Sequence, residues 1–384
     1  MQIGASAVQT GAVQVGRPTR AHLYQLDVIR LLTCIGVVAI HTVELILPES
    51  RAGGAVVMAL HTTRELFFFL TALALTYSAG AADRVVAAVP LWRRRYPLIL
   101  VPYLSWTVLY WAGDSVSWGQ LWPPDVNLAQ LGTDLLIGWN HLYFLFVTMQ
   151  FYAVFPLLAW GLRRSRGWHW AVLGLSAALE LAATGLMQYG GSEIPRALRF
   201  WFDNADINVV SYQFAFVVGA VTGAHLDAIV GVLRRNRQWV GLAAAAGVVI
   251  GEATYLVNLL VLGLPTQAAA APLQPAIVPL TLAAVLALAS VADWIVLGYR
   301  SDGRVWKMFR NGADASFGIF LAHVAVLYVL VQPAVRSVLG LAALPGVPLV
   351  VVTFALTVAA TWALVEGLRR TPVSRMLTGR ARRA

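Results

Sequence analysis

Four ionisable residues share one face of the first apolar stretch in this 384-residue chain. The stretch LDVIRLLTCIGVVAIHTVE runs from Leu26 to Glu44 and also contains Asp27, Arg30 and His41. At about 100° per residue in a helix, the four ionisable side chains fall within about 60° of a single line. A rise of about 1.5 Å per residue separates Arg30 from His41 by about 16 Å. Ionisable groups in a lipid-embedded span are costly and therefore indicate a functional site.

The types and spacing of these residues suggest proton transfer. Histidine ionises near neutral pH, so His41 is the candidate general base that takes a proton from a hydroxyl group. Glu44, one turn further on, is the candidate carboxylate that orients the imidazole, as in catalytic triads. The alternatives are a helix-packing histidine bonded to a neighbouring span and an interfacial carboxylate in water. Thr33, Cys34 and Val37 on the same line leave room for a slender ligand.

The composition predicts the elements that position this face. The chain is 59% hydrophobic and 12% charged, and apolar runs of about 20 residues recur throughout. We therefore expect an all-α, polytopic membrane protein with about ten transmembrane helices. In the second span the clean apolar part is 66–82, so 55–65 forms either part of the span or a helix on the membrane surface. The expected spans are 26–47, 55–80, 97–113, 141–162, 168–187, 207–229, 239–264, 273–299, 316–338 and 346–368.

The distribution of basic residues predicts the topology. The net charge is +10, and 22 of the 28 lysine and arginine residues lie on one side of the expected spans. The positive-inside rule places that side in the cytoplasm, with both termini, as expected for a multi-pass protein of the cell (inner or plasma) membrane. We expect a cytoplasmic segment at 1–25, a membrane domain at 26–368 and a basic cytoplasmic tail at 369–384. Because topology accounts for the charge, we expect the lipid bilayer as a partner and no nucleic acid.

Metal and disulfide chemistry find no support in the sequence. Cys34 is the single cysteine, which excludes an intramolecular disulfide and a cysteine-based metal site. No paired carboxylates stand at metal-ligand spacing. We expect no bound metal and no permanently bound cofactor.

The first apolar stretch resembles the signature of the acyltransferase-3 family, membrane O-acyltransferases that modify bacterial surface carbohydrates. The matching residues are Leu26, Asp27, Arg30 and His41. Four further segments resemble family segments in the same order, and the third of them is similar to the subgroup of intercellular-adhesin and enterobacterial-common-antigen acyltransferases. They are ELFFFLTALALTYS at 65–78, RRRYPLILVPYLSW at 93–106, HLYFLFVTMQFYAVFPLL at 141–158 and SFGIFLAH at 316–323.

The chain departs from the family pattern at two places. Thr71-Ala72 replaces the usual Ser-Gly, which leaves a close helix approach there without its glycine. Arg93, Arg94 and Arg95 are consecutive, whereas the family often has two basic residues three apart.

The resemblance implies transfer of an acyl group, with acetyl expected, from cytoplasmic acyl-CoA to a hydroxyl of a cell-surface or lipid-linked carbohydrate. It implies that Arg30 contacts the pantetheine or phosphates of the donor. The alternative, an intrahelical pair with Asp27 three residues earlier, is compatible with that role. Arg93, Arg94 and Arg95 match the charge of the CoA phosphates. Topology alone explains these three arginines equally well.

Further candidates for substrate binding lie near the expected level of the general base. His61, Arg64 and Glu65 belong to the second expected span, and Arg64 and Glu65 could instead pair with each other. His141 opens the fourth span and is a candidate ligand for acceptor hydroxyls or an interfacial histidine. His323 lies within a span, where it must hydrogen-bond to a partner, and we expect a structural role for it.

Two features of the sequence, the tryptophans of one loop and the overall function, each allow two interpretations. Loop 114–140 contains Trp118, Trp122 and Trp139, which form either an interfacial aromatic belt or a sugar-stacking platform. A glycan exporter without acyl-transfer chemistry is the alternative to an enzyme, although inverted repeats and broken helices typical of transporters are not visible.

Overall fold

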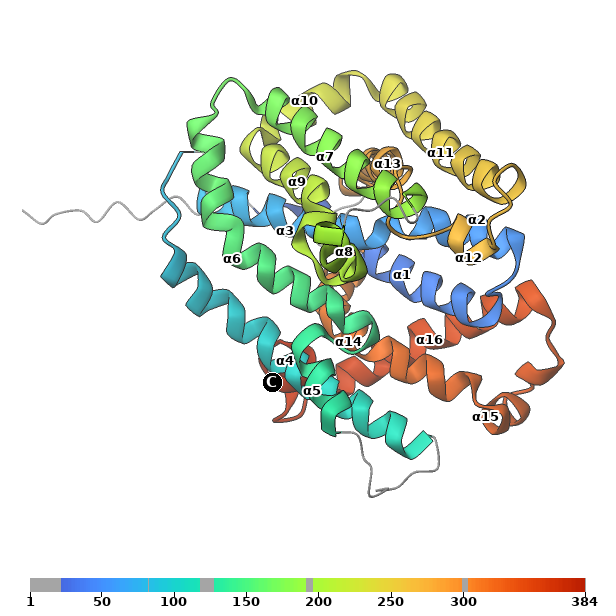
Figure 1. The fold of residues 1–384 in the computed structure, drawn as a ribbon. Coiled ribbons are helices and arrows are strands. Elements are labelled where there is room, and N and C mark those ends of the chain that lie inside the picture. Colours follow the sequence, from blue (N-terminus) through green and yellow to red (C-terminus); the bar gives the residue numbers. More distant parts are fainter. Residues whose placement is uncertain (1–21, 82, 118–127, 191–195, 299–302, 384) are drawn as a thin grey trace, which may run out of the picture.

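The computed structural model describes residues 22–383 except 82, 118–127, 191–195 and 299–302. In these residues the regular elements are helices, arranged as a bundle with α1 and α3 near its centre (Figure 1). The longer helices are α1 (Tyr24–Ile46), α2 (Arg51–Leu60), α3 (Thr62–Ala79), α4 (Ala88–Ser117), α5 (Leu128–Ile137), α6 (Tyr143–Arg164), α7 (His169–Tyr189), α8 (Arg196–Asp203), α9 (Gln213–Ala224), α10 (Leu226–Arg235), α11 (Arg237–Leu260), α13 (Ile277–Gly298), α14 (Arg304–Val331) and α16 (Gly346–Leu368). The remaining α-helices are short: α12 (Thr266–Ala269), α15 (Pro333–Val338) and α17 (Ser374–Thr378). Short 3₁₀ helices lie at Asn140–Leu142, Ala205–Ile207, Val209–Tyr212 and Leu341–Ala343.

The predicted all-α, polytopic architecture is confirmed. The expected spans fall on helical segments, because only an internally hydrogen-bonded helix satisfies the backbone in lipid. Some of them are divided between helices, among them 55–80 between α2 and α3, and 207–229 between α9 and α10. Among the described residues, eight helices are long and apolar enough to cross a membrane. A ninth span results if the segment containing α9 is joined to α10 across a bend of 93°. Helix α4 does not meet this test, and the sequence shows why: prolines, tyrosines and tryptophans replace aliphatic residues along it.

The second expected span contains a break. Helices α2 and α3 meet at His61 and together form a 29-residue apolar segment. Helix α2 packs against α1, α11 and α12, and its Met58 is fully buried. Residues 55–60 are therefore integrated into the bundle rather than lying on its surface.

Helix α1 runs through the centre of the bundle and contacts α2, α3, α13, α14 and α16. Its contact with α14 is close because Gly312 faces Leu31; a Cβ at Gly312 would lie 2.7 Å from the Leu31 side chain. One turn further along, Cys34 Sγ donates a hydrogen bond to the carbonyl oxygen of Ser316 at 3.3 Å. These contacts fix the rotation of α1 and so the direction of its polar face.

Helix α3 carries Thr71-Ala72 where the family has a glycine, and the glycines that allow a close contact with α3 lie instead on α9. Gly219 and Gly223 of α9 lie one turn apart against the backbone of α3. A side chain at Gly219 would overlap the carbonyl oxygen of Phe69, so the contact requires glycine. Small residues four apart are a common way for membrane helices to approach each other.

The two ends of the bundle differ in charge. Helix α1 begins and α16 ends at the end that also holds the clusters Arg93–Arg95, Arg163–Arg164 and Arg234–Arg235, and we call it the basic end. The expected tail packs against this end of the bundle as far as the structure describes it, to Arg383.

Candidate functional site

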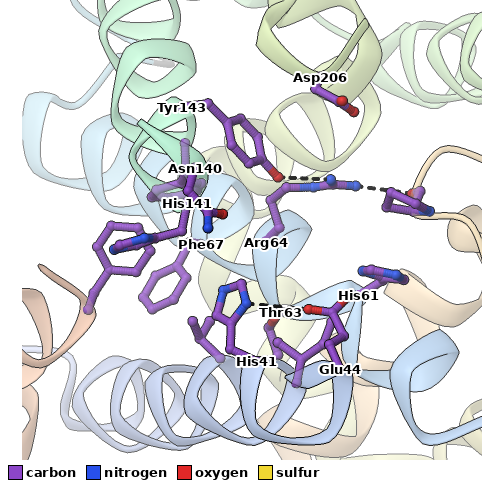
Figure 2. A pocket seen from close by; sticks show the side chains of 15 residues that line it. His41, Glu44, His61, Thr63, Arg64, Phe67, Asn140, His141, Tyr143 and Asp206 are labelled. Atoms are coloured by element: carbon purple, nitrogen blue, oxygen red, sulfur yellow. Dashed lines mark hydrogen bonds and ion pairs between the residues drawn. The ribbon is translucent and has the colours of Figure 1, made fainter. Parts of the chain in front are cut away.

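A cavity of about 260 Å³ lies in the half of the bundle away from the basic end. Figure 2 shows the side chains that line it. It is enclosed by the second half of α1, the first turns of α3 and α6, and residues from three other segments. Five predicted site residues line it: His41, Glu44, His61, Arg64 and His141. Residues from three parts of the sequence thus meet at one space.

His41 and Glu44 form the central pair of the cavity. They lie three residues apart on the unbroken helix α1, and His41 Nδ1 is 3.3 Å from Glu44 Oε2 (Figure 2). Both side chains remain partly exposed, at 28% for His41 and 40% for Glu44. With Nδ1 directed at the carboxylate, Nε2 is left to accept a proton. No hydrogen bond ties His41 to a neighbouring helix in the described part of the chain, so the helix-packing role lacks a partner.

Two more histidine rings lie beside His41. The ring centroids of His41 and His323 are 5.3 Å apart, and those of His41 and His141 are 6.1 Å apart. His323 is fully buried, and its Nδ1 lies 2.7 Å from the carbonyl oxygen of Phe320. An Nδ1–H that donates to this carbonyl fixes the tautomer and leaves Nε2 as an acceptor. Among the described residues, no group of three histidine, cysteine or acidic side chains has a geometry that could hold a metal.

His141 has unused hydrogen-bonding capacity. It is 3% exposed, and neither ring nitrogen has a partner among the described residues. Aromatic rings surround it, with Tyr110, Trp139 and Phe320 in edge-to-face contact. A neutral imidazole carries one donor and one acceptor, and leaving a buried polar group unpaired costs about 1–3 kcal/mol. Since His141 lines the cavity, a hydroxyl or carbonyl of a ligand there can satisfy it.

Arg64 is held by several partners at once. Its Nε and Nη2 donate hydrogen bonds of 3.1 and 2.7 Å to Glu65 Oε1. It also donates hydrogen bonds of 3.1 Å to the Tyr143 hydroxyl and the Pro272 carbonyl (Figure 2). Its guanidinium also lies 4.5 Å from the centre of the Tyr212 ring. These bonds use all but one of the five N–H donors of the guanidinium. Arg64 therefore joins α3 to the wall of the cavity and has little capacity left for a substrate.

The structure also adds cavity residues that the sequence did not indicate. Asn140, Tyr143 and Asp206 line the space together with the predicted residues. Asn140 has a positive φ of 37°, a conformation that asparagine tolerates better than most residues. Asn140 and Tyr143 lie within two residues of His141 in the sequence, so their position beside a candidate ligand could have indicated them as cavity residues. Asp206 lies in a short 3₁₀ turn ahead of α9, and nothing in its sequence context indicated it.

Arg30 lies outside the cavity, which extends toward the basic end as far as Val37. The alternative role, an intrahelical pair with Asp27, is not formed at ion-pair distance among the described residues; Asp27 Oδ2 lies 2.7 Å from His22 Nε2. Arg30 is partly buried and makes no hydrogen bond or ion pair with the residues that the structure describes. A partly buried guanidinium with open hydrogen-bond donors can bind an anion through charge-assisted hydrogen bonds.

The three consecutive arginines at the start of α4 face different surroundings. Arg93 and Arg94 are exposed, whereas Arg95 is half-buried. Trp92 Nε1 donates a hydrogen bond of 2.8 Å to the carbonyl oxygen of Tyr152, which anchors this turn of α4 on α6. Arg95 alone of the three is partly buried, and its charge is close enough to interact with the Tyr152 side chain of α6.

Of the three tryptophans in loop 114–140, the structure describes Trp139. Trp139 is 8% exposed, stacks on Tyr110 at 4.2 Å, and donates a hydrogen bond of 2.7 Å to Asp114. It is a buried packing residue and supports neither an exposed aromatic belt nor a stacking platform. Trp118 and Trp122 lie outside the described residues.

The comparison with protein families gives one match. The acyltransferase-3 family model, described as an acyltransferase domain, matches residues 23–366 and thus every element that lines the cavity. No curated protein and no solved structure matches the chain. The subgroup suggested by residues 141–158 stays a prediction. The chain belongs to the acyltransferase-3 family and is a multi-pass membrane acyltransferase.

Proposed function

We propose that the protein transfers an acyl group, with acetyl expected, from cytoplasmic acyl-CoA to a hydroxyl of a cell-surface or lipid-linked carbohydrate. The observation that carries this proposal is the His41–Glu44 pair, which faces a cavity beside the unpartnered imidazole of His141. This arrangement combines a base, a carboxylate to orient it and a free hydrogen-bonding group. The family assignment favours such transfer chemistry over the exporter alternative.

The proposed reaction uses the free nitrogen of His41. Nε2 removes the proton of the acceptor hydroxyl while its oxygen attacks the thioester carbonyl of the donor. The carbon–sulfur bond then breaks, and the CoA thiolate takes a proton from the imidazolium, so that an ester and free CoA leave. Glu44 stabilises the transient positive charge on His41. His141 offers its N–H or its lone pair to the acceptor or to the acyl carbonyl.

The two substrates approach from opposite faces in this proposal. Basic residues cluster at the end where α1 begins, so the positive-inside rule places that end in the cytoplasm and the cavity in the outer half of the membrane. Arg30 lies on α1 about 16 Å from His41, since eleven residues of unbroken helix separate them. The long, thin pantetheine arm suits this distance, with the CoA phosphates at Arg30 and the thioester at His41.

The orientation can be tested at the two ends of α11. The natural Cys34 is 1% exposed, so it does not compete for a labelling reagent. Asn236 at the basic end and Gln267 at the opposite end are both exposed. We expect a membrane-impermeant maleimide to label Gln267→Cys in intact cells, and Asn236→Cys only after the membrane is opened. The reverse pattern would overturn the orientation and the placement of the cavity.

Arg95 is expected to serve the donor, and its neighbours provide matched controls. We expect Arg95→Gln to raise the KM for acyl-CoA about tenfold, because a charge-assisted hydrogen bond to phosphate is lost. Arg93→Gln and Arg94→Gln remove the same charge from exposed positions and should leave that KM nearly unchanged. Equal effects of the three variants would mean that the arginines act only through topology or general attraction.

The direct test of the function is the product. Membranes that contain the protein are incubated with radiolabelled acetyl-CoA, and the labelled envelope component is isolated and hydrolysed with mild base. We expect base-labile label on a carbohydrate, as an O-ester requires. Transfer that is absent, or that equals that of membranes without the protein, would contradict the proposal.

A further inference from the structure

The C-terminal segment, residues 374–383, is part of the bundle rather than an appended tail. Helix α17 packs between α4, α14 and α16, and Figure 1 shows this red segment beside α4. Trp106 of α4 donates a hydrogen bond of 2.9 Å to the carbonyl oxygen of Leu377. Ser374 and Thr378 are fully buried. A segment with these contacts is positioned by the helices around it.

The turn after α17 has one conformation that its surroundings enforce. Gly379 has a φ of 65°, and a Cβ there would lie 2.6 Å from the Phe317 ring. Ser374 Oγ donates a hydrogen bond of 2.9 Å to the carbonyl oxygen of Arg380. Beyond the turn, Arg383 pairs with Glu366 of α16 at 3.0 Å. The backbone at Arg380 is therefore held by contacts on both sides in the sequence: the turn at Gly379 before it and the Arg383–Glu366 pair after it.

This turn brings Arg380 to the level of Arg30. Arg380 pairs with Asp314 of α14 at 3.5 Å. On the same stretch of α14, Gly312 faces Leu31, next to Arg30 on α1. Arg30 lies within electrostatic reach of both Arg380 and Asp314. Two arginines that are 350 residues apart in the sequence thus share one region of the basic end.

Arg95 approaches the same region from α4. Arg95 and Arg30 both lie within electrostatic reach of Tyr152, which is 7% exposed. One turn after Arg95, the carbonyl oxygen of Leu98 lies 3.2 Å from the position of a Cβ at Gly379. Helices α1 and α4 and the C-terminal segment therefore each direct one arginine to this place, and we call these three the arginine cluster: Arg30, Arg95 and Arg380.

The charge of the arginine cluster is not balanced by its surroundings. The two carboxylates in reach of Arg30 are Asp314, which Arg380 contacts, and Asp27, which His22 contacts. Arg30 and Arg95 make no ion pair with a described residue. Guanidinium groups bind phosphate oxygens through paired, charge-assisted hydrogen bonds, and several of them suit a ligand with several phosphates.

We propose that the C-terminal segment completes the donor site, with Arg380 binding phosphate groups of CoA together with Arg30 and Arg95. This inference rests on the proposed use of acyl-CoA. It assigns a binding function to a segment that the sequence presents only as a basic tail. Arg380 is 47% exposed and so remains accessible to a ligand despite its contact with Asp314.

The test compares two arginines of the same segment. Arg380→Gln removes a charge from the cluster, whereas Arg375→Gln removes one from an exposed position on α17. CoA is titrated into the purified full-length protein by calorimetry, and KM for acetyl-CoA is measured in membranes. We expect Arg380→Gln to weaken CoA binding and raise this KM about tenfold with kcat little changed, and Arg380→Lys to retain part of the affinity. Arg375→Gln should match the wild type.

The outcomes separate this inference from the proposed function. If both Arg380→Gln and Arg375→Gln bind CoA as tightly as the wild type does, the proposed role of Arg380 is wrong, but CoA remains the proposed donor. If the wild type does not bind CoA, the donor and this inference are both wrong. Equal weakening by both variants would indicate general attraction of an anion and would also overturn the specific role of Arg380.

Discussion

His41→Ala is expected to reduce acyl transfer by about 10²–10⁴-fold, the usual loss when a general base is removed. His41 projects into the cavity from the second half of α1 and makes its close polar contact with Glu44 on the same helix. Its removal should therefore leave the packing of α1 intact. CoA affinity should also persist, because the arginine cluster lies about 16 Å away along the helix. Label transfer from acetyl-CoA measures the first effect and calorimetry the second.

Two variants sharpen this test. His41→Gln preserves a hydrogen-bonding side chain but cannot take a proton at neutral pH, so it should not restore transfer. His169→Ala removes a histidine near the basic end, outside the cavity, and should retain full activity. If His41→Ala keeps near-normal transfer, the base lies elsewhere. His61, which lines the same cavity, would be the next candidate.

Val37→Trp is expected to block turnover without removing any polar group. Val37 marks the inner limit of the cavity, between His41 and the arginine cluster. An indole there would occupy much of a space of about 260 Å³, so the thioester could not reach His41. Transfer should fall below detection in the same label assay, while CoA still binds at the basic end.

The control for this variant is a tryptophan on another face of the same helix. Leu45 is 42% exposed on the outside of α1, so Leu45→Trp tests the cost of the larger residue without filling the cavity. Thermal unfolding of both variants shows whether the fold survives. Activity of a folded Val37→Trp protein would contradict passage of the donor along this part of α1.

Local patterns determined much of the fold and the pairing of His41 with Glu44. Apolar length specifies a helix in lipid whatever its neighbours are, so the expected spans fell on helical segments, although 55–80 and 207–229 were each divided between two helices. The spacing of His41 and Glu44 placed both on one face because helical periodicity is a property of the chain itself. Their contact of 3.3 Å follows from that spacing.

Tertiary structure decided which faces meet. His141 and His323 join His41 only because α6 and α14 pack against α1, and such packing depends on the fit of distant surfaces. The glycine that permits close approach to α3 lay on α9, where the motif on α3 gave no sign of it. The family match supports the assignment to acyltransferases but does not supply these contacts.

For the arginines, too, the sequence determined the general location and the tertiary structure decided which of them lie together. The sequence predicted that basic residues gather at one end of the bundle, since net charge and its distribution can be counted along the chain. It could not distinguish Arg95 from Arg93 and Arg94, because rotation of α4 about its axis is set by its contact with α6. Nor could it place Arg380, whose position depends on the return of the C-terminal segment between three helices. Periodicity assigns residues to a helix face, and only packing assigns that face to a site.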